Sequence, residues 1–372
     1  MPSTVFAGKK VALVHDWLNG MRGGEKCLEV FCELFPHADL YTLFHEAGKV
    51  SARIEAMRII PSVMQKFPFV FKKYRHYLPL FPWAIERFDL SEYDLILSSS
   101  HCVAKGVRHN GRPYHVSYIP TPMRYMWGLF ETYFGRDRVS GRVHILAKAI
   151  RPYLQNWDVR SSERVHHFLC NSYNVQQRIL TIYGKASEVI HPPVDLSRFR
   201  RGETWKNYYL MIGAFAPNKR VDLAIHAFNL LKIPLKIVGS GQEEVYCQSI
   251  AQPHIEFLGK VDDPTISLLY REAKAFVFPG EDDFGITPLE AQASGTPVIA
   301  YAKGGALETV TEKTGVFFHE PTVEALREAI EQMEKRRACF SAEACVRQAK
   351  QFGRERYKQQ ILHALEVGYQ QR

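Results

Sequence analysis

The side chains best suited to chemistry lie in one acidic loop and in the helix expected after it. Three acids, residues 281–283, follow the apolar run Ala275–Phe278 after a Pro-Gly pair, and such a run is typical of a buried strand. The spacing predicts a helix with Thr287 as its N-cap and Glu290 in its first turn. Parallel α/β sheets bind ligands at the carboxyl ends of their strands, so these carboxylates could bind a polar ligand. Glu290 could instead be a capping-box side chain that accepts the backbone N–H of Thr287.

Asp282 and Glu290 stand eight residues apart, with a Phe-Gly pair and Pro288 between them. This arrangement resembles the signature of family 4 of the retaining GT-B glycosyltransferases. The resemblance implies that Glu290 binds the ribose diol of a sugar nucleotide, and that Asp282, or Glu281 before it, faces the transferred hexose. Mannosyltransferases of bacterial O-antigen assembly are similar over the longer run FPGEDDFGITPLEAQASGTPVIAYAKGGALETV.

The order of elements supports the same fold class. Strands alternate with helices in both halves of the chain, which predicts two parallel, doubly wound sheets. The resemblance implies an α/β protein of GT-B fold, in which two Rossmann-like domains face each other across a cleft. We expect an acceptor domain at residues 1–190, completed by a terminal helix at 353–372, and a nucleotide-sugar-binding domain at 191–352. The proline-rich segment Val189–Asp195 should link the two domains.

Composition limits the classes of protein that remain. A chain of 372 residues can hold two ordinary domains, and its seven cysteines include no C-x-x-C pair. That cysteine usage disfavours a disulfide framework and suits a cytoplasmic protein. The sequence shows neither an apolar run long enough to span a bilayer nor a signal peptide. A formal charge of +9 predicts attraction to polyanions without choosing among them.

Glycines in the first half could bind an anion. The strand predicted at Val11–Val14 is followed by a glycine-bearing loop and by a helix expected to begin at Glu25. Backbone N–H groups at such a helix start can point at a phosphate. By itself the glycine pair could equally be a tight turn. The resemblance implies that Gly23 and Gly24 face the donor diphosphate.

A lysine and an arginine in the second half are candidates for binding phosphate. Lys219 and Arg220 follow the strand predicted at Tyr208–Gly213 and precede the helix predicted at Val221–Leu231. Cations at this position could stabilise a diphosphate leaving group without a metal, and Lys219 matches the family lysine that contacts the diphosphate. Without the resemblance, an exposed turn lysine would be the simpler interpretation. Backbone amides that could also contact phosphate or hexose are those of Gly285, Ile286, Gly304 and Gly305.

Two further candidates follow predicted strands of the first half. His101 comes after the strand at Asp94–Ser98, and Arg124 comes after the strand at His115–Ile119. Both should therefore lie at the carboxyl edge of the sheet, although a lone histidine is more often structural than catalytic. Each lies in a segment that resembles the O-antigen branch, which implies a catalytic role.

The sequence departs from the family pattern at three positions. Pro120 stands where a histidine that contacts the transferred sugar is expected, and Gly128 replaces an acid after the tryptophan. Ala214 replaces an arginine five residues before Lys219, so one of two expected phosphate-binding cations is missing. Arg220 or Arg22 could substitute for it.

A basic and aromatic segment at residues 64–88 differs from the rest of the chain. Five Lys and Arg residues alternate with Phe, Tyr and Trp. One interpretation is a pair of helices with a solvated basic face over a core stripe. The other is a patch that docks on anionic lipid, near a lipid-linked acceptor.

The resemblance implies a glycosyltransferase that moves a hexose to a lipid-linked glycan, and the likeness to the O-antigen branch implies mannose from GDP-mannose. We expect a cytoplasmic protein, at the inner face of the plasma membrane if the patch docks there. No cofactor or metal is expected. The acids at 281–283 could form a metal-binding cluster as in the other glycosyltransferase fold, but the doubly wound halves argue against that fold. The alternatives are a UDP- or dTDP-sugar transferase, or a degenerate nucleotide-sugar-binding subunit. No nucleic-acid-binding module is apparent.

Overall fold

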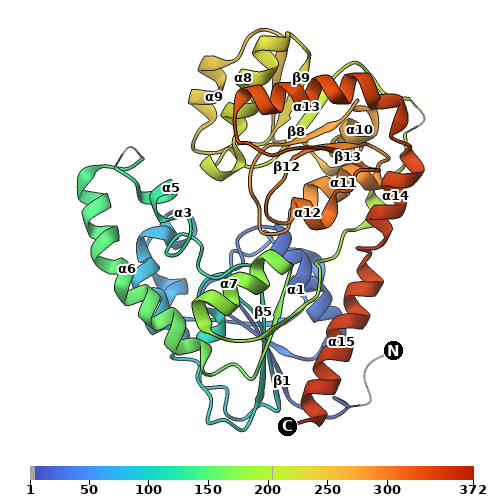
Figure 1. Ribbon diagram of the computed structural model, residues 1–372. Coiled ribbons are helices and arrows are strands. Elements are labelled where there is room, and N and C mark those ends of the chain that lie inside the picture. Colours follow the sequence, from blue (N-terminus) through green and yellow to red (C-terminus); the bar gives the residue numbers. More distant parts are fainter. Residues whose placement is uncertain (1–4, 137, 203) are drawn as a thin grey trace. The chain divides into compact units, whose positions relative to one another are not determined.

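The computed structural model describes residues 5–136, 138–202 and 204–372, which form two compact units (Figure 1). Unit 1 contains the chain up to Pro192 together with Tyr357–Arg372, and unit 2 contains Pro193–Arg356. Each unit is built on its own parallel sheet. No helix in the described ranges has the length and apolar character needed to cross a membrane.

Unit 1 has a seven-stranded sheet in the order β3-β2-β1-β4-β5-β6-β7. Its strands are β1 (Val11–His15), β2 (Asp39–Thr42), β3 (Arg58–Pro61), β4 (Leu95–Ser99), β5 (Tyr114–Ile119), β6 (His167–Cys170) and β7 (Ser187–Val189). Its α-helices are α1 (Gly23–Leu34), α2 (Ala52–Glu55), α3 (Val70–Lys73), α4 (Phe81–Ile85), α5 (Phe130–Phe134), α6 (Gly141–Ser162), α7 (Tyr173–Tyr183) and most of α15 (Arg354–Gln370), and its 3-10 helices are η1 (Val63–Lys66), η2 (Tyr74–Leu80) and η3 (Ala104–Gly106).

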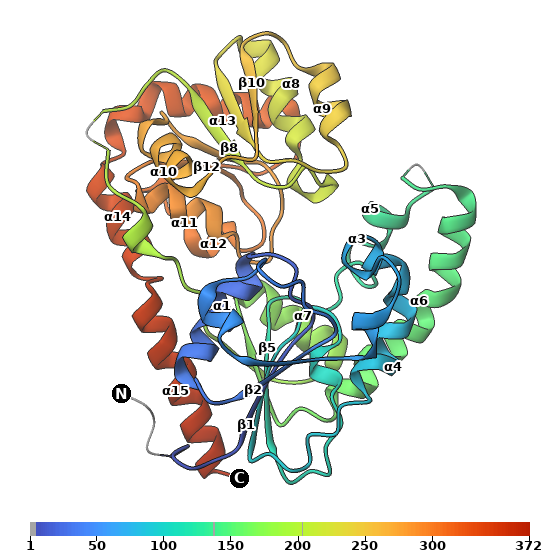
Figure 2. The same cartoon turned by 180° about the vertical axis from the view of Figure 1, so that it is seen from behind.

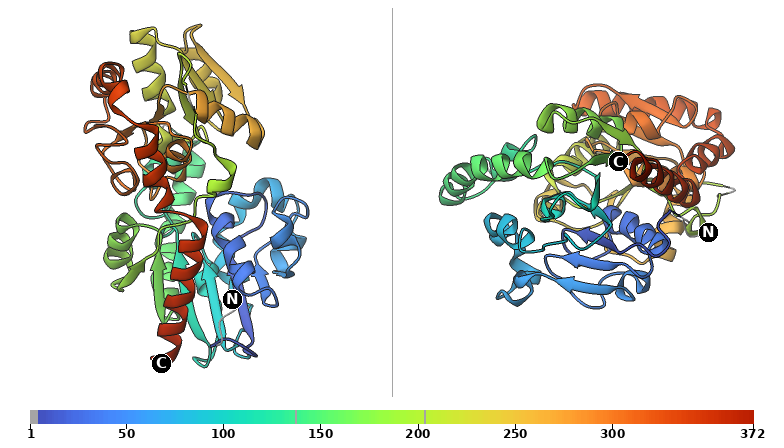
Figure 3. Two further views of the ribbon diagram at one scale, coloured as in Figure 1. Left: turned by 90° about the vertical axis from the view of Figure 1, so that its right-hand side faces the viewer. Right: turned by 90° about the horizontal axis from the view of Figure 1, so that it is seen from below.

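The central strands of unit 1 are buried on both faces, as expected for a parallel sheet covered by helices. Against one face, Phe31 of α1 and Tyr357 of α15 both pack on Tyr118 of β5. Figures 1 and 2 show α15 beside α1, and Figure 3 shows it running along the strands. Lys358 and Glu33 form an ion pair between the two helices at 3.7 Å. The last helix therefore completes the core of unit 1.

Unit 2 has a six-stranded sheet in the order β10-β9-β8-β11-β12-β13. Its strands are β8 (Tyr209–Ile212), β9 (Leu235–Val238), β10 (Ile255–Gly259), β11 (Phe276–Phe278), β12 (Val298–Tyr301) and β13 (Gly315–Phe318). Its α-helices are α8 (Val221–Leu231), α9 (Glu244–Ile250), α10 (Asp263–Glu272), α11 (Ile286–Ala293), α12 (Ala306–Thr309), α13 (Val323–Arg336) and α14 (Ala342–Lys350), and its 3-10 helices are η4 (Leu196–Arg198), η5 (Pro217–Lys219) and η6 (Arg337–Cys339).

Both sheets reverse their strand order beside their first strand. In unit 1 the reversal lies between β1 and β4, and in unit 2 it lies between β8 and β11. The loops that leave the carboxyl ends of such a strand pair diverge to opposite faces of the sheet, which leaves a crevice where α/β proteins bind ligands. The two reversal points are therefore the places to search for function.

The start of α11 differs from the prediction. The helix begins at Ile286 with Gly285 as its N-cap, so Thr287 lies inside the first turn and the predicted Thr287 cap is wrong. Gly285 has φ of +81°, a left-handed conformation in which a threonine would be strained. An added Cβ there would also lie 2.9 Å from the Phe278 ring. The glycine therefore sets the boundary of the helix.

Candidate functional site

An ion pair marks the reversal point of unit 2. Lys219 ends η5 after β8, and its ammonium group binds a carboxylate oxygen of Asp282 in the loop after β11. The Asn218 amide donates to the other carboxylate oxygen at 3.3 Å. Lys219 also lies over the Phe278 ring, 5.9 Å from its centroid. The lysine and the carboxylate predicted to contact the donor are thus in direct contact with each other.

The loop after β12 closes on the same acidic loop. The Gly305 N–H donates to the Asp282 carbonyl at 2.9 Å, so that amide is used within the protein. A Cβ at Gly305 would lie 2.2 Å from the Phe284 Cα, which means that the two backbones approach too closely for any other residue. Lys303 pairs with Glu281 at 3.4 Å, and Gly304 lies between these contacts. The predicted residues of both loops are therefore neighbours.

Glu290 is buried in α11, with 8% of its surface exposed. The Tyr270 hydroxyl on α10 donates to its Oε2 at 3.2 Å. Burial and the Glu290 charge together hold the pKa of Tyr270 well above its usual value, so the hydroxyl keeps its proton. Because Thr287 is not the N-cap, the alternative capping-box role of Glu290 is wrong, and its carboxylate is fixed by a neighbouring helix instead.

Arg220 is close in sequence to Lys219 but has a different partner. Its backbone is left-handed, with φ of +51°, and it forms the N-cap of α8. Its Nε pairs with Asp222 Oδ1 at 3.3 Å. The side chain is therefore drawn toward the first turn of α8, and Lys219 is the cation bound to Asp282.

The reversal point of unit 1 is organised by Asp16, just after β1. Its two carboxylate oxygens accept the backbone N–H groups of four consecutive residues after β4, at 2.6–2.9 Å; these residues are His101, Cys102, Val103 and Ala104. The His101 Nδ1 also lies 3.0 Å from Asp16 Oδ2. Burial opposes ionisation of Asp16, but the nearby His101 and His15 together outweigh burial and lower the pKa of the carboxyl. Asp16 thus fixes the loop that carries His101.

His101 remains partly accessible, with 27% of its side chain exposed. Its ring meets the Trp17 ring edge-on at 4.5 Å. Buried His15 lies 6.0 Å from His101, ring to ring, and its Nε2 lies 3.8 Å from Glu25 Oε1. Burial opposes ionisation of Glu25, but the nearby histidines lower its pKa. Gly23 and Gly24 are the first two residues of α1.

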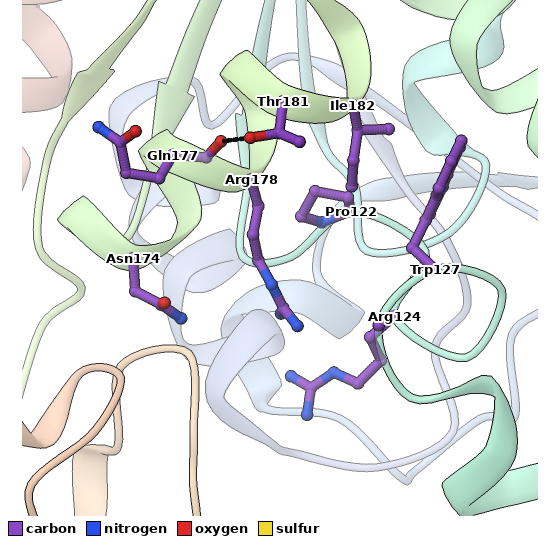
Figure 4. A pocket seen from close by; sticks show the side chains of 9 residues that line it. Pro122, Arg124, Trp127, Asn174, Gln177, Arg178, Thr181 and Ile182 are labelled. Atoms are coloured by element: carbon purple, nitrogen blue, oxygen red, sulfur yellow. Dashed lines mark hydrogen bonds between the residues drawn. The ribbon is translucent and has the colours of Figure 1, made fainter.

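Arg124 lines a cavity of about 310 Å³. The cavity lies between the loop after β5 and the helix α7, and Figure 4 shows the residues that line it. Lining residues include Pro122, Arg124, Trp127, Asn174, Gln177 and Arg178.

Several important contacts had no clear signal in the sequence. Asn218 was overlooked although it precedes Lys219, and Tyr270 lies on another helix, twenty residues before Glu290. Asp16 had a usable signal, because it is the first carboxylate after the first buried strand. Arg178 had none, because its approach to Arg124 depends on the pairing of β5 with β6.

Part of the chain matches a known protein family. Residues 195–352 match the family described as Glycosyl transferases group 1. They are a glycosyltransferase group 1 domain. The group 1 domain falls within unit 2 and includes Lys219, Asp282 and Glu290. The match ends before the segment of α15 that belongs to unit 1.

Two curated relatives are O-antigen mannosyltransferases by name. RfbU of Salmonella typhimurium is 32% identical over 151 residues, which cover 37% of this chain and 43% of RfbU. O-antigen chain mannosyltransferase B of Escherichia coli is 28% identical over 179 residues, which cover 44% of this chain and 46% of that protein. The chain therefore spans less than half the length of either relative.

A solved structure agrees with the fold over nearly the whole chain. Anabaena HepE in complex with UDP superposes with a TM-score of 0.71 at 18% identity, covering 96% of this chain and 100% of HepE. Together with the two doubly wound sheets, this likeness assigns the GT-B fold. The predicted fold class is confirmed.

Proposed function

We propose that this chain is a retaining glycosyltransferase that transfers mannose from GDP-mannose to a lipid-linked glycan. The observation that carries the proposal is the contact between Lys219 and Asp282 at the β8/β11 reversal point of the group 1 domain. Glu290, buried in the middle of the helix that follows, supplies the carboxylate for the ribose diol.

The proposed reaction breaks the bond between the anomeric carbon and the diphosphate oxygen. A new bond forms from the acceptor hydroxyl oxygen to the same face of that carbon, and the hydroxyl proton passes to the departing phosphate oxygen. Lys219 would stabilise the negative charge that develops on the diphosphate, an effect typically worth about 2.7–4 kcal/mol of barrier for one such group. Asp282, which itself accepts a hydrogen bond from the Asn218 amide, positions the Lys219 ammonium beforehand.

The choice of mannose is supported by the names of the two mannosyltransferase relatives. The structural neighbour HepE was solved with UDP, which supports a UDP-sugar transferase as the second candidate. A third candidate, a nucleotide-sugar-binding subunit without activity, is supported by Pro120 and Ala214, which lack the side chains expected there.

A thermal-shift experiment with GDP, UDP and dTDP would separate these candidates. At about a hundredfold excess over the dissociation constant, the bound nucleotide adds roughly 2.7 kcal/mol of stability. For a domain of this size that raises the melting midpoint by roughly 5–10 °C. A response to GDP alone supports the proposal, and a response to UDP or dTDP instead selects the alternative donor. Binding of GDP without hydrolysis or transfer of GDP-mannose selects the binding subunit.

Two lysine variants would show whether the nucleotide occupies the proposed site. Lys219→Met should reduce the thermal shift that GDP produces, because it removes the cation beside Asp282. It should also lower the rate of GDP-mannose hydrolysis by at least tenfold. Lys313→Met is the matched control, since that lysine is exposed in the turn before β13. Equal behaviour of the two variants would place the nucleotide elsewhere. Repeating the assay with EDTA tests the prediction that no metal is required.

We also propose that unit 1 contacts anionic membrane. The basic and aromatic segment forms short helices, among them α3 and α4, and it exposes Phe69 and Trp83 at 71% and 46% of their surfaces. Ile145 and Leu146 at the start of α6 are 70% and 61% exposed. Figures 1 and 2 both show α3 and α5 close to α6. Exposed apolar side chains among lysines and arginines are typical of a surface that docks on anionic lipid.

Co-sedimentation with vesicles tests this contact. Binding should require phosphatidylglycerol, weaken at high salt, and fall in Phe69→Ser and Ile145→Ser. The matched control is Leu230→Ser, because Leu230 is 63% exposed on α8 of unit 2. Binding that is indifferent to lipid charge, or equally weakened by the control, would refute the proposal.

A further inference from the structure

The cavity beside Arg124 has the composition of an anion site. Arg124 enters it from the loop after β5, and Arg178 enters it from α7. Figure 4 shows the two side chains reaching toward the same space from opposite sides. The amides of Asn174 and Gln177 line it as well, and none of the nine described lining residues carries a carboxylate. Two guanidinium groups that line one cavity can share an anion between them, because each offers several N–H donors.

Gly128 makes room for one of the arginines. A Cβ at this position would lie 2.8 Å from Arg178 Nη2, so the guanidinium lies against the glycine backbone. The contact involves the far end of a flexible side chain, so a larger residue at 128 would displace Arg178 without breaking the fold. A carboxylate placed there would stand directly beside the guanidinium.

The loop that carries Arg124 is held in place from behind by α6. Arg151 Nε and the Gln155 amide each donate to the Met126 carbonyl at 2.9 Å. The Trp127 indole donates to Asp158 at 2.8 Å, and Asp158 forms a buried ion pair with Lys105 at 2.5 Å. A preformed, anchored wall of this kind lowers the entropic cost of binding a ligand.

We propose that this cavity binds a phosphoryl group of the acceptor substrate, held between Arg124 and Arg178. The proposal rests on the proposed transferase function, because it assigns the cavity to the second substrate. Arginine is the residue best matched to phosphate, since its planar fork can donate two parallel hydrogen bonds. A volume of about 310 Å³ lies at the lower end of the range of roughly 300–1,000 Å³ for small-ligand sites. The phosphoryl group could belong to a phosphorylated sugar or to the diphosphate of a lipid carrier.

Calorimetric titration with glucose 1-phosphate and with geranyl diphosphate would test the site and separate these two sources. The wild-type chain should bind at least one probe, and the tighter probe identifies the source. Arg178→Gln should weaken binding roughly tenfold or more, because it removes charge-assisted hydrogen bonds. Arg53→Gln, an exposed arginine on α2, should bind as the wild type does.

The decisive pair of variants is Gly128→Asp and Gly128→Asn, which have nearly the same shape and differ in charge. The aspartate should neutralise Arg178 and weaken binding at least tenfold more than the asparagine does. Equal binding by the two variants, or no binding of either probe by the wild type, would overturn the proposal. The GDP shift should persist in Gly128→Asp, and probe binding should persist in Lys219→Met. If the GDP shift is seen but no probe binds, the cavity proposal fails and the donor-site proposal stands. If a probe binds but GDP gives no shift, the donor-site proposal fails.

Discussion

The pairing of Glu290 with Tyr270 allows the roles of Glu290 in stability and in donor binding to be separated. Glu290→Gln keeps an oxygen for the Tyr270 hydroxyl but removes the negative charge. A hydrogen bond to a charged group contributes about 1.5–3 kcal/mol, against about 0.5–1.5 kcal/mol for a neutral pair. If the carboxylate accepts two ribose hydroxyls, the amide should weaken nucleotide binding by about 2–3 kcal/mol, or roughly 30- to 150-fold. The melting midpoint of the free protein should change little.

Glu290→Ala should lose both properties. It leaves the hydroxyl of Tyr270, which is fully buried, without this acceptor, at a cost of about 1–3 kcal/mol of stability. Tyr270→Phe is the matched control, because it removes the hydroxyl and leaves the carboxylate in place. Urea unfolding and GDP titration on all three variants separate the effects. If Glu290→Gln bound GDP as tightly as the wild type, the assignment of Glu290 to the ribose would be refuted.

Three more perturbations follow from the structure. Asp16→Asn should destabilise unit 1 by about 2–5 kcal/mol in urea unfolding, since an amide cannot accept all four N–H groups; an unchanged midpoint would contradict this. Burial holds the pKa of His115 well below its usual value, so the unfolded chain binds a proton that the folded chain does not. The free energy of unfolding should therefore fall as pH drops below about 6.5, by up to about 1.36 kcal/mol per pH unit, and less steeply in His115→Asn. Gly305→Ala should weaken GDP binding and lower the melting midpoint, because the new Cβ forces apart the loops after β11 and β12. Gly213→Ala is the control, since a Cβ at Gly213 meets open space and should change neither quantity.

Periodicity and turn residues predicted most of the elements that position the site. The predicted helix Val221–Leu231 matches α8 residue for residue, and the strand predicted at Val11–Val14 lies within β1 (Val11–His15). Both succeed because a strong local pattern, apolar spacing bounded by loop residues, agrees with the tertiary structure. Lys219 and Asp282 were predicted in separate loops, and the carboxyl-edge rule correctly placed both loops at one edge of the sheet.

The failures have physical causes that a single sequence does not display. The Thr287 cap was predicted from propensity, but the left-handed turn at Gly285 starts α11 earlier. The strands β2 and β3 were not predicted, because they lie toward the edge of the sheet, where burial is incomplete and the apolar pattern is weak. Tyr270, which binds Glu290, and Arg178, which lines the cavity with Arg124, lie on helices whose positions depend on sheet order. The local spacing of residues does not encode that order.

The helix that completes unit 1 has a consequence for how the protein is made. Tyr357 and Ile361 belong to the same core as Phe31, yet they leave the ribosome only after all of unit 2 has been synthesised. At translation rates of about 5–20 residues per second, the nascent first sheet waits on the order of ten to thirty seconds with part of one face uncovered. Domains usually fold in the order of their synthesis, but here unit 2 can fold before unit 1 is complete. A chaperone that shields apolar surface would have most to do during that interval.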